Sequence, residues 1–177
     1  MIIGHLGVAL GARAIRKETP FAWLVAATYA PDVVDYVVGL SGVCLNNGVY
    51  SHSIPAIAAL CLVLGAGARW ETRSARVGIT VAVLVVLHLL ADLLTGHKTL
   101  WPGTHAVGLD LYSVPLADFV LESAVIIAGW ALLRRARGTP RWTTAWVTLA
   151  VLLLLQAGGN ASSDNAPYKK PDACLES

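Results

Sequence analysis

The sequence predicts an all-α, polytopic membrane protein: a helical bundle of about six helices with a polar, metal-type site in the outer half of the membrane. Hydrophobic residues make up 56% of the 177 residues, charged residues only 14%, and the mean hydropathy is +0.63. Soluble domains carry about 25% charged residues, so this composition excludes an ordinary soluble domain. We expect residues 1–158 to form one membrane-embedded domain and residues 159–177 a polar, flexible C-terminal tail.

The first predicted helix covers about residues 2–16. Because it lacks a basic n-region and a small-residue cleavage site, we interpret it as a retained helix and not a signal peptide. It is short for a full span, and Gly4, Gly7 and Gly11 leave it a thin face for close packing against a neighbour.

The second predicted helix, residues 20–40, is apolar except at its middle. Pro31 removes one backbone donor there, so we expect the helix to kink or break. Asp32 and Asp35 follow Pro31 and share one helix face, because they are three residues apart.

Four further helices are expected at residues 54–69, 77–97, 114–133 and 142–158. Ser53 is a suitable N-cap for the first of them. Within the second, His88 and Asp92 lie four apart and therefore on one face. An ionisable residue inside a membrane span is costly and indicates function by default, although a hydrogen bond that joins two helices is the alternative.

Basic residues indicate the orientation. Ten of the 13 Lys and Arg residues lie in or beside the linkers that join helices one and two, three and four, and five and six. The other three are Lys98, Lys169 and Lys170. The positive-inside rule therefore predicts that these three linkers are cytoplasmic, and that both termini and the loops 41–53 and 97–113 face outside.

The ionisable residues of the spans fall at one depth. At about 1.5 Å rise per residue they lie roughly 5–12 Å below the outer helix ends, with His52 at the outer rim. We expect no Lys or Arg near them, so a bound cation is the natural counter-charge. His97 and His105 are expected to be loop residues outside the site. The predicted layer consists of His5, Asp32, Asp35, His88, Asp92, Asp118 and Glu122, with His52 and His97 at its outer rim.

Short motifs follow one another along the chain: His5, Pro31-Asp32, Ser51-His52-Ser53, His88 with Asp92, His97 with Trp101-Pro102-Gly103, and Gly108, Leu109, Leu111 and Pro115 leading to Glu122. In this order and spacing they resemble the YdjM-like family of prokaryotic membrane-bound metal-dependent hydrolases over roughly residues 1–158. Many members carry an HRGxTHS element, whereas Asn46, Asn47 and Gly48 precede Ser51-His52-Ser53 here. The resemblance implies a prokaryotic plasma-membrane location, a metal site and hydrolysis; it implies no particular substrate.

The predicted function is therefore a metal-dependent hydrolase that acts from the outer face. The expected ligands of one or two divalent ions, with zinc the expected metal, are His88, Asp92, Asp32, His52, His5 and Glu122. Glu122 or Asp35 is the expected general base. The depth of the site favours a phosphoester or a lipid-linked substrate, with membrane lipids as neighbours and no nucleic-acid partner.

Two other classes of function remain open at this stage. The protein could bind or transport cations along the acidic layer and the Pro31 break, or it could be a structural membrane protein with a relic site. Among the three cysteines, none has CxxC spacing, which excludes a cysteine-type zinc motif. Cys44 and Cys174 both lie on the predicted outer side, so we hypothesise a disulfide between them.

Overall fold

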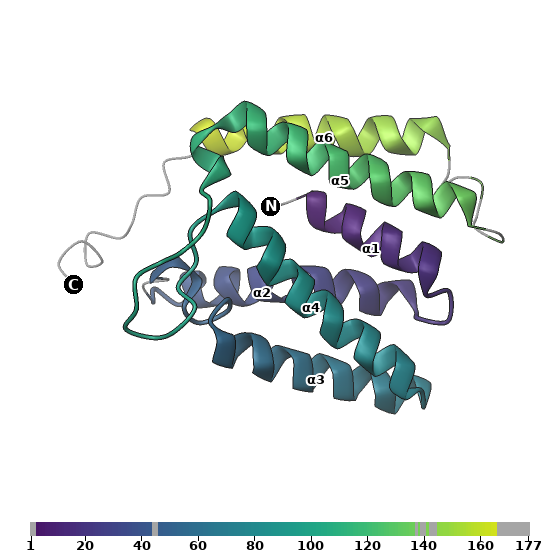
Figure 1. Ribbon diagram of the computed structural model, residues 1–177, viewed down its shortest axis with the longest axis horizontal. Helices are drawn as coiled ribbons and strands as arrows, with labels where there is room; N and C mark the ends of the chain where they lie inside the picture. Colours follow the sequence, from purple (N-terminus) through teal and green to yellow (C-terminus); the bar gives the residue numbers. More distant parts are fainter. Residues whose placement is uncertain (1–2, 44–45, 137, 139–140, 142–144, 166–177) are drawn as a thin grey trace.

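Six α-helices run in alternating directions through the part of the chain that this computed structural model describes, residues 3–43, 46–136, 138, 141 and 145–165 (Figure 1). Within those residues no β-strand occurs, and the predicted all-α fold is confirmed. The elements are α1 (Gly4–Ile15), α2 (Phe21–Leu40), the 3-10 helix η1 (Asn46–Gly48), α3 (Ile54–Thr72), α4 (Ala75–Thr95), the 3-10 helix η2 (Leu111–Ser113), α5 (Pro115–Arg135) and α6 (Trp146–Asn165).

Four helices, α2, α3, α4 and α5, are long and apolar enough to cross a membrane. The apolar part of α6 is shorter, Trp146–Gly159, and α1 has the limited length that its sequence predicts, 12 residues. The described part of α6 continues to Asn165, although we expected this helix to end near residue 158. Gly158 and Gly159 lower helix propensity without ending the helix, because no proline follows them before Asn165. Cys44 and Cys174, and with them the hypothesised disulfide, lie outside the described residues.

Local sequence signals account for most of the helix starts. The Ser53 hydroxyl accepts a hydrogen bond from the Ala56 amide at 3.4 Å, which confirms the predicted cap of α3. Pro115 is the first residue of α5, a position where the missing amide donor costs nothing. Pro31 does not break α2, which is continuous from Phe21 to Leu40.

Glycines let pairs of helices approach to backbone contact. A Cβ on Gly7 of α1 would lie only 2.6 Å from the carbonyl oxygen of Val125 in α5. In the same way, a Cβ on Gly78 of α4 would lie 2.6 Å from the Gly65 carbonyl oxygen of α3. The predicted thin face of α1 therefore packs on α5, and α1 in turn contacts α2, which contacts α4.

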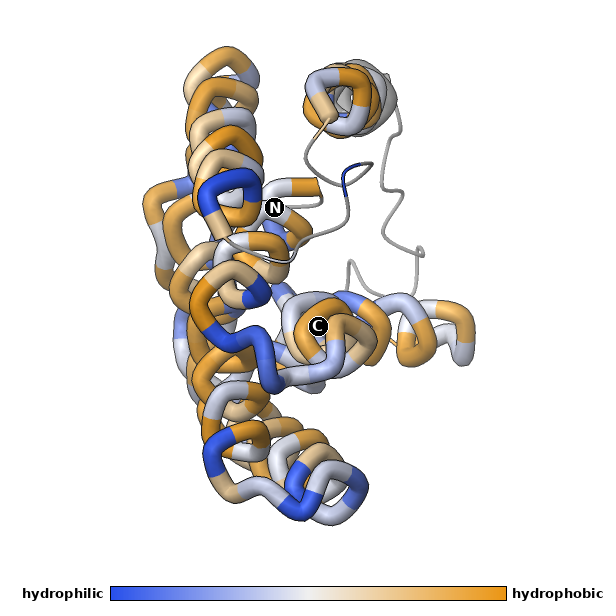
Figure 2. The backbone as a smooth tube through the Cα atoms, turned by 90° about the vertical axis from the view of Figure 1, so that its right-hand side faces the viewer, coloured by the Kyte–Doolittle hydropathy of each residue, from blue (hydrophilic) through white to orange (hydrophobic). Residues whose placement is uncertain are grey.

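The two ends of the bundle differ in charge. One end of the bundle is formed by the start of α1, the end of α2, the start of α3, the end of α4 and the start of α5, each of which is the left-hand end of its helix in Figure 1. The basic linkers after α1, α3 and α5 lie at the other end. Figure 2 looks at that basic end: hydrophilic positions lie on the near helix ends and linkers, while much of the helical tube is hydrophobic.

At the non-basic end, two loops are tied to each other and to α4. The Thr99 amide donates to the Asn47 carbonyl at 3.0 Å, and the Ile54 amide donates to the Leu100 carbonyl at 2.9 Å. Gly108 has φ of +150° and packs so tightly on the Gly96 carbonyl that a side chain there would overlap it. These contacts hold the segment after α4 against the segment before α3.

Candidate metal centre

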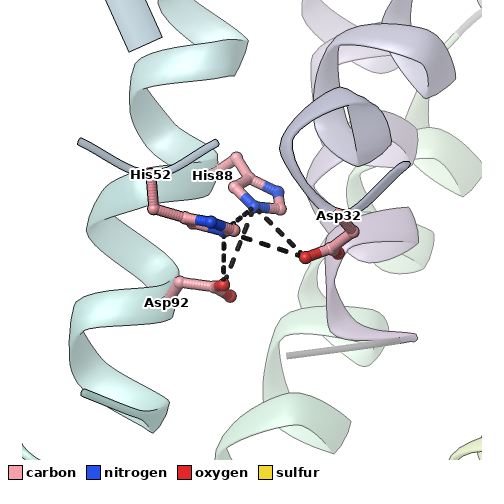
Figure 3. Close-up of side chains that lie close together, drawn as sticks. All are labelled: Asp32, His52, His88 and Asp92. Atoms are coloured by element: carbon pink, nitrogen blue, oxygen red, sulfur yellow. Dashed lines mark hydrogen bonds and ion pairs between the residues drawn. The ribbon is translucent and has the colours of Figure 1, made fainter. Parts of the chain in front are cut away.

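Four of the predicted ligands converge at the non-basic end of the bundle: Asp32 from α2, His52 from the segment before α3, and His88 and Asp92 from α4 (Figure 3). Each offers one ligand atom, and the four atoms all lie within 4.8 Å of one another. Hereafter these residues are called the four-residue group. A His2Asp2 set of this kind could hold a metal ion, because imidazole and carboxylate together suit zinc and similar divalent ions.

The distances within the group suit ligands around one small cation. His52 Nε2 lies 3.0 Å from His88 Nε2 and 3.0 Å from Asp92 Oδ2. Asp32 Oδ1 lies 3.8 Å from His52 Nε2 and 3.6 Å from His88 Nε2. Ligand bonds of ~2.1 Å in a tetrahedral site place the ligand atoms about 3.4 Å apart. The group therefore has nearly the size that a bound ion requires.

The backbone of α2 orients His88. Its Nδ1 lies 2.8 Å from the carbonyl oxygen of Thr28, which can only accept a hydrogen bond. Nδ1 must therefore carry the proton, and in a neutral ring Nε2 presents its lone pair to the group. Metal-bound histidines are typically oriented in this way, with the second ring nitrogen donating to a carbonyl or carboxylate.

Asp35 and Ser51 orient His52. The Ser51 hydroxyl donates to Asp35 Oδ1 and lies 2.5 Å from His52 Nδ1, while Asp35 Oδ2 lies 3.4 Å from the same nitrogen. Gly48, at φ +77°, leaves room for this contact, since a Cβ there would lie 2.9 Å from Nδ1. Burial alone would lower the pKa of His52, but its hydrogen bonds to Asp35 and Asp92 outweigh burial and raise the pKa above its usual value.

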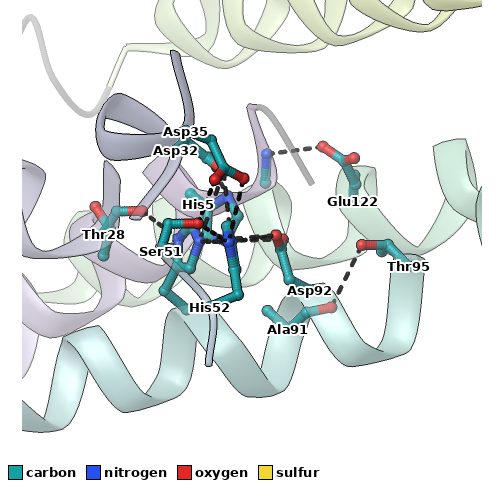
Figure 4. Close-up of polar contacts among 12 residues, drawn as sticks. His5, Thr28, Asp32, Asp35, Ser51, His52, Ala91, Asp92, Thr95 and Glu122 are labelled. Carbon is teal, nitrogen blue, oxygen red and sulfur yellow. Dashed lines mark hydrogen bonds and ion pairs between the residues drawn. The ribbon is translucent and has the colours of Figure 1, made fainter. Parts of the chain in front are cut away.

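His5 lies beside the four-residue group and is fully buried. Its ring stacks on that of His88, with the centroids 4.0 Å apart. His5 Nε2 lies 3.5 Å from Asp92 Oδ1, and Nδ1 lies 3.9 Å from Asp32 Oδ2. His5 thus faces the carboxylate oxygens that point away from the other two histidines, so α1 contributes directly to the surroundings of the group (Figure 4).

Lys98 corrects one expectation. We expected no basic side chain near the acidic layer, yet Lys98 Nζ lies 2.8 Å from Asp92 Oδ2. The residue follows the end of α4, and its backbone is held by an antiparallel bridge to Val107. One positive charge therefore already offsets part of the negative charge at the group.

Glu122 lies apart from the four-residue group. Its Oε2 accepts a hydrogen bond from the Gly4 amide at 3.0 Å, at the first turn of α1 (Figure 4). A carboxylate is favourable there because the first amides of a helix have no partner within the helix. Glu122 therefore holds the start of α1, one residue before His5, against α5.

A cavity of about 390 Å³ opens beside the group. It is bounded by α2, the end of α4, the segment after α4, and η2. The side chain of Asp32 is 37% exposed, whereas His52, His88 and Asp92 are buried. Asp32 is therefore the most accessible member of the four-residue group. The lining consists of Tyr29, Asp32, Val33, Tyr36, Asp92, Lys98 and Tyr112.

The remaining histidines of the long loop lie outside the group, as expected. His97 is exposed and pairs with Asp110 at 3.4 Å, and His105 is exposed. The sequence reasoning missed Thr28, Lys98 and Tyr112. The spacing Tyr29, Asp32, Val33, Tyr36 marks one face of α2 and could have indicated the cavity wall.

Comparisons with known proteins agree with this picture of a membrane protein. Neither a curated protein nor a solved structure matches the chain. The family model described as YdjM inner membrane protein matches residues 1–161, nearly the whole described region. A match of that extent, together with the helices that can span a membrane and the His/Asp group they bring together, shows that this chain belongs to the YdjM inner membrane protein family.

Proposed function

We propose that this chain is a membrane-embedded, metal-dependent hydrolase in which Asp32, His52, His88 and Asp92 hold a divalent ion, with zinc the expected metal. The substrate class we propose is a phosphoester or a lipid-linked ester that reaches the group through the cavity beside α2. The basic linkers at the opposite end support an orientation with the group and both termini on the outer side.

One observation carries the proposal: two histidine Nε2 atoms face each other at 3.0 Å while both rings are oriented through Nδ1. When both rings are neutral, they direct lone pairs at one another and at two carboxylates; a proton on His52, which Asp35 and Asp92 favour, or a metal ion relieves this contact. Lone pairs at that separation repel unless a proton or a metal ion lies among them. A divalent cation satisfies all four groups at once, which a single proton cannot do.

The charges support a divalent ion. Asp32, Asp35 and Asp92 carry three negative charges when ionised, and Lys98 carries one positive charge. Two negative charges therefore remain when the histidines are neutral, which is the form that binds a metal ion. Burial of uncompensated charge is costly, so a +2 ion completes the balance.

When bound, such an ion supplies Lewis-acid activation of a water molecule and of the scissile group. The protein residues place the reacting groups. The buried histidines fix the ligand positions from α4 and from the segment before α3, while Asp32 stands at the cavity side. The contacts of Asp35 favour orientation of His52 over general-base catalysis, and those of Glu122 favour anchoring of α1.

Transport of cations receives less support. That alternative used a break in α2 at Pro31, and α2 is continuous there. The half of α4 that precedes His88 is apolar from Val81 to Leu87, so it offers no polar path toward the basic end.

The test is metal analysis of the detergent-purified protein with His88→Ala, Asp92→Asn and the control Asp110→Asn. Asp110 also contacts a histidine, His97, but lies in the long loop. We expect wild type and the control to retain zinc and both group variants to lose it while circular dichroism stays helical. Chelator-sensitive hydrolysis in a screen of phosphoesters and lipid phosphates should follow the metal content. Wild-type metal content in both group variants would contradict the proposal.

A further inference from the structure

The cavity beside the four-residue group combines acidic, basic and phenolic side chains. Asp32 and Asp92 of the four-residue group line it together with Lys98 and Tyr112 from the segment after α4 and with Tyr29, Val33 and Tyr36 from α2. Its volume of about 390 Å³ suits a small headgroup, since ligand cavities start near ~300 Å³.

Among the described residues that line the cavity, Lys98 is the one with a positively charged side chain. Its side chain is only 16% exposed, and Asp92 Oδ2 fixes its Nζ at 2.8 Å. An ammonium group has three donors, so the contact with Asp92 leaves further donors available. The position of Nζ beside a metal-ligand candidate means that an anion bound to Lys98 also lies next to the four-residue group.

The geometry points to a phosphate headgroup as the occupant of this cavity, with Lys98 as the residue that binds its oxygen. This inference rests on the proposed function and specifies its substrate. A phosphate group has several oxygens in a tetrahedral arrangement and can contact an ammonium, phenolic hydroxyls and a metal ion together. A carboxylate has only two oxygens in one plane and satisfies fewer of these donors.

The wall formed by α2 favours a lipid as the source of the phosphate. Val33 is 56% exposed and Tyr36 is 69% exposed, and both line the cavity while lying on a helix that can span a membrane. Apolar surface at the rim of a polar cavity suits the first carbons of an acyl or prenyl chain, because their burial against Val33 removes apolar area from water. A soluble phosphoester lacks that contribution.

The test measures binding of inorganic phosphate, dihexanoyl phosphatidic acid and hexanoate to the full-length protein in detergent, with zinc and after chelation. The variant is Lys98→Met, the conservative rescue is Lys98→Arg, and the matched control is Lys17→Met in the linker between α1 and α2. Val33→Ser tests the apolar wall. Zinc content is measured for every variant, so a loss of metal is separated from a loss of anion binding.

We expect Lys98→Met to weaken phosphatidic acid binding at least tenfold relative to Lys17→Met at unchanged zinc content, with Lys98→Arg restoring most of it. Tighter binding of the lipid than of inorganic phosphate, reduced by Val33→Ser, identifies a lipid source; equal binding identifies a soluble phosphoester. A Lys98-dependent loss in chelated protein supports the phosphate site even if the metal proposal fails. Equal binding by Lys98→Met and Lys17→Met, or hexanoate binding as tight as phosphate, overturns the inference.

Discussion

Replacement of Asp35 by asparagine tests whether the four-residue group binds a metal ion and whether Asp35 orients one of its ligands, His52. Asp35 does not belong to the four-residue group; its Oδ2 lies 3.4 Å from His52 Nδ1, on the far side of the ring from Nε2. If His52 binds metal through Nε2, Asp35 strengthens that bond by accepting a hydrogen bond from the Nδ1–H group, which fixes the ring.

The expected loss of zinc affinity is about tenfold, or ~1.4 kcal/mol, at the lower end of the 10–100-fold range for such partners. The lower end applies because the Ser51 hydroxyl also contacts His52 Nδ1 and remains in place after the substitution. Because asparagine keeps the size of aspartate, no cavity adds to this effect.

The assay is zinc affinity from competition with a chelator of known strength, performed on purified full-length protein. Asp110→Asn is a closely matched control: its Oδ1 also lies 3.4 Å from a histidine Nδ1, that of His97, outside the four-residue group. We expect Asp35→Asn to weaken zinc binding and Asp110→Asn to leave it unchanged. Equal affinities for the two variants would refute the assignment of Asp35 as a positioning residue of a metal ligand.

Three further predictions follow from the packing, from α5 and from the charge distribution. Gly7→Ala should lower the free energy of unfolding by about 1–3 kcal/mol in chemical denaturation, because the added methyl would lie 2.6 Å from the α5 backbone. Gly11→Ala is the control and should lower it far less, since its methyl meets only ordinary contacts near 3.6 Å. Similar losses for the two variants would contradict this packing. Glu122→Gln should keep wild-type metal content, since the amide oxygen can still accept from the α1 amide; metal loss would instead make Glu122 a ligand. In a cysteine-free background, Thr104→Cys should react with a membrane-impermeant thiol reagent in intact cells and Arg135→Cys should not; the reverse labelling would invert the proposed orientation.

The helices and the class of protein could be predicted from local sequence. Apolar runs of span length, the Ser53 cap and the basic linkers are each properties of a short stretch, so α2 to α5 were expected close to where they lie. The same holds for His88 and Asp92: their spacing of four on one helix places them on one face whatever packs against it. Local signals were weaker at α6, where two glycines did not end the helix.

The four residues of the group come together because of the orientation of each helix about its axis and the choice of its packing partners. A shared depth could be estimated from residue counts for His5 and Asp32, and both lie near the α4 pair. His52 was expected at the outer rim, and its contact with Asp92 is a result of the tertiary structure. Depth alone could not separate these residues from Glu122, which faces the start of α1 because the glycine contact of α1 with α5 brings its amides there.

By itself, then, the sequence determined a helical membrane protein with an acidic and histidine-rich layer opposite its basic linkers, because hydrophobicity, charge and helical spacing are local quantities. Only the tertiary structure decided which members of that layer share one point, that Asp35 and Thr28 orient the two rings, and that Lys98 returns to Asp92. The Thr28 contact depends on the packing of α2 against α4, and backbone hydrogen bonds join the loop before α3, which carries His52, to the loop after α4, which carries Lys98. No periodicity within one segment encodes such contacts between two.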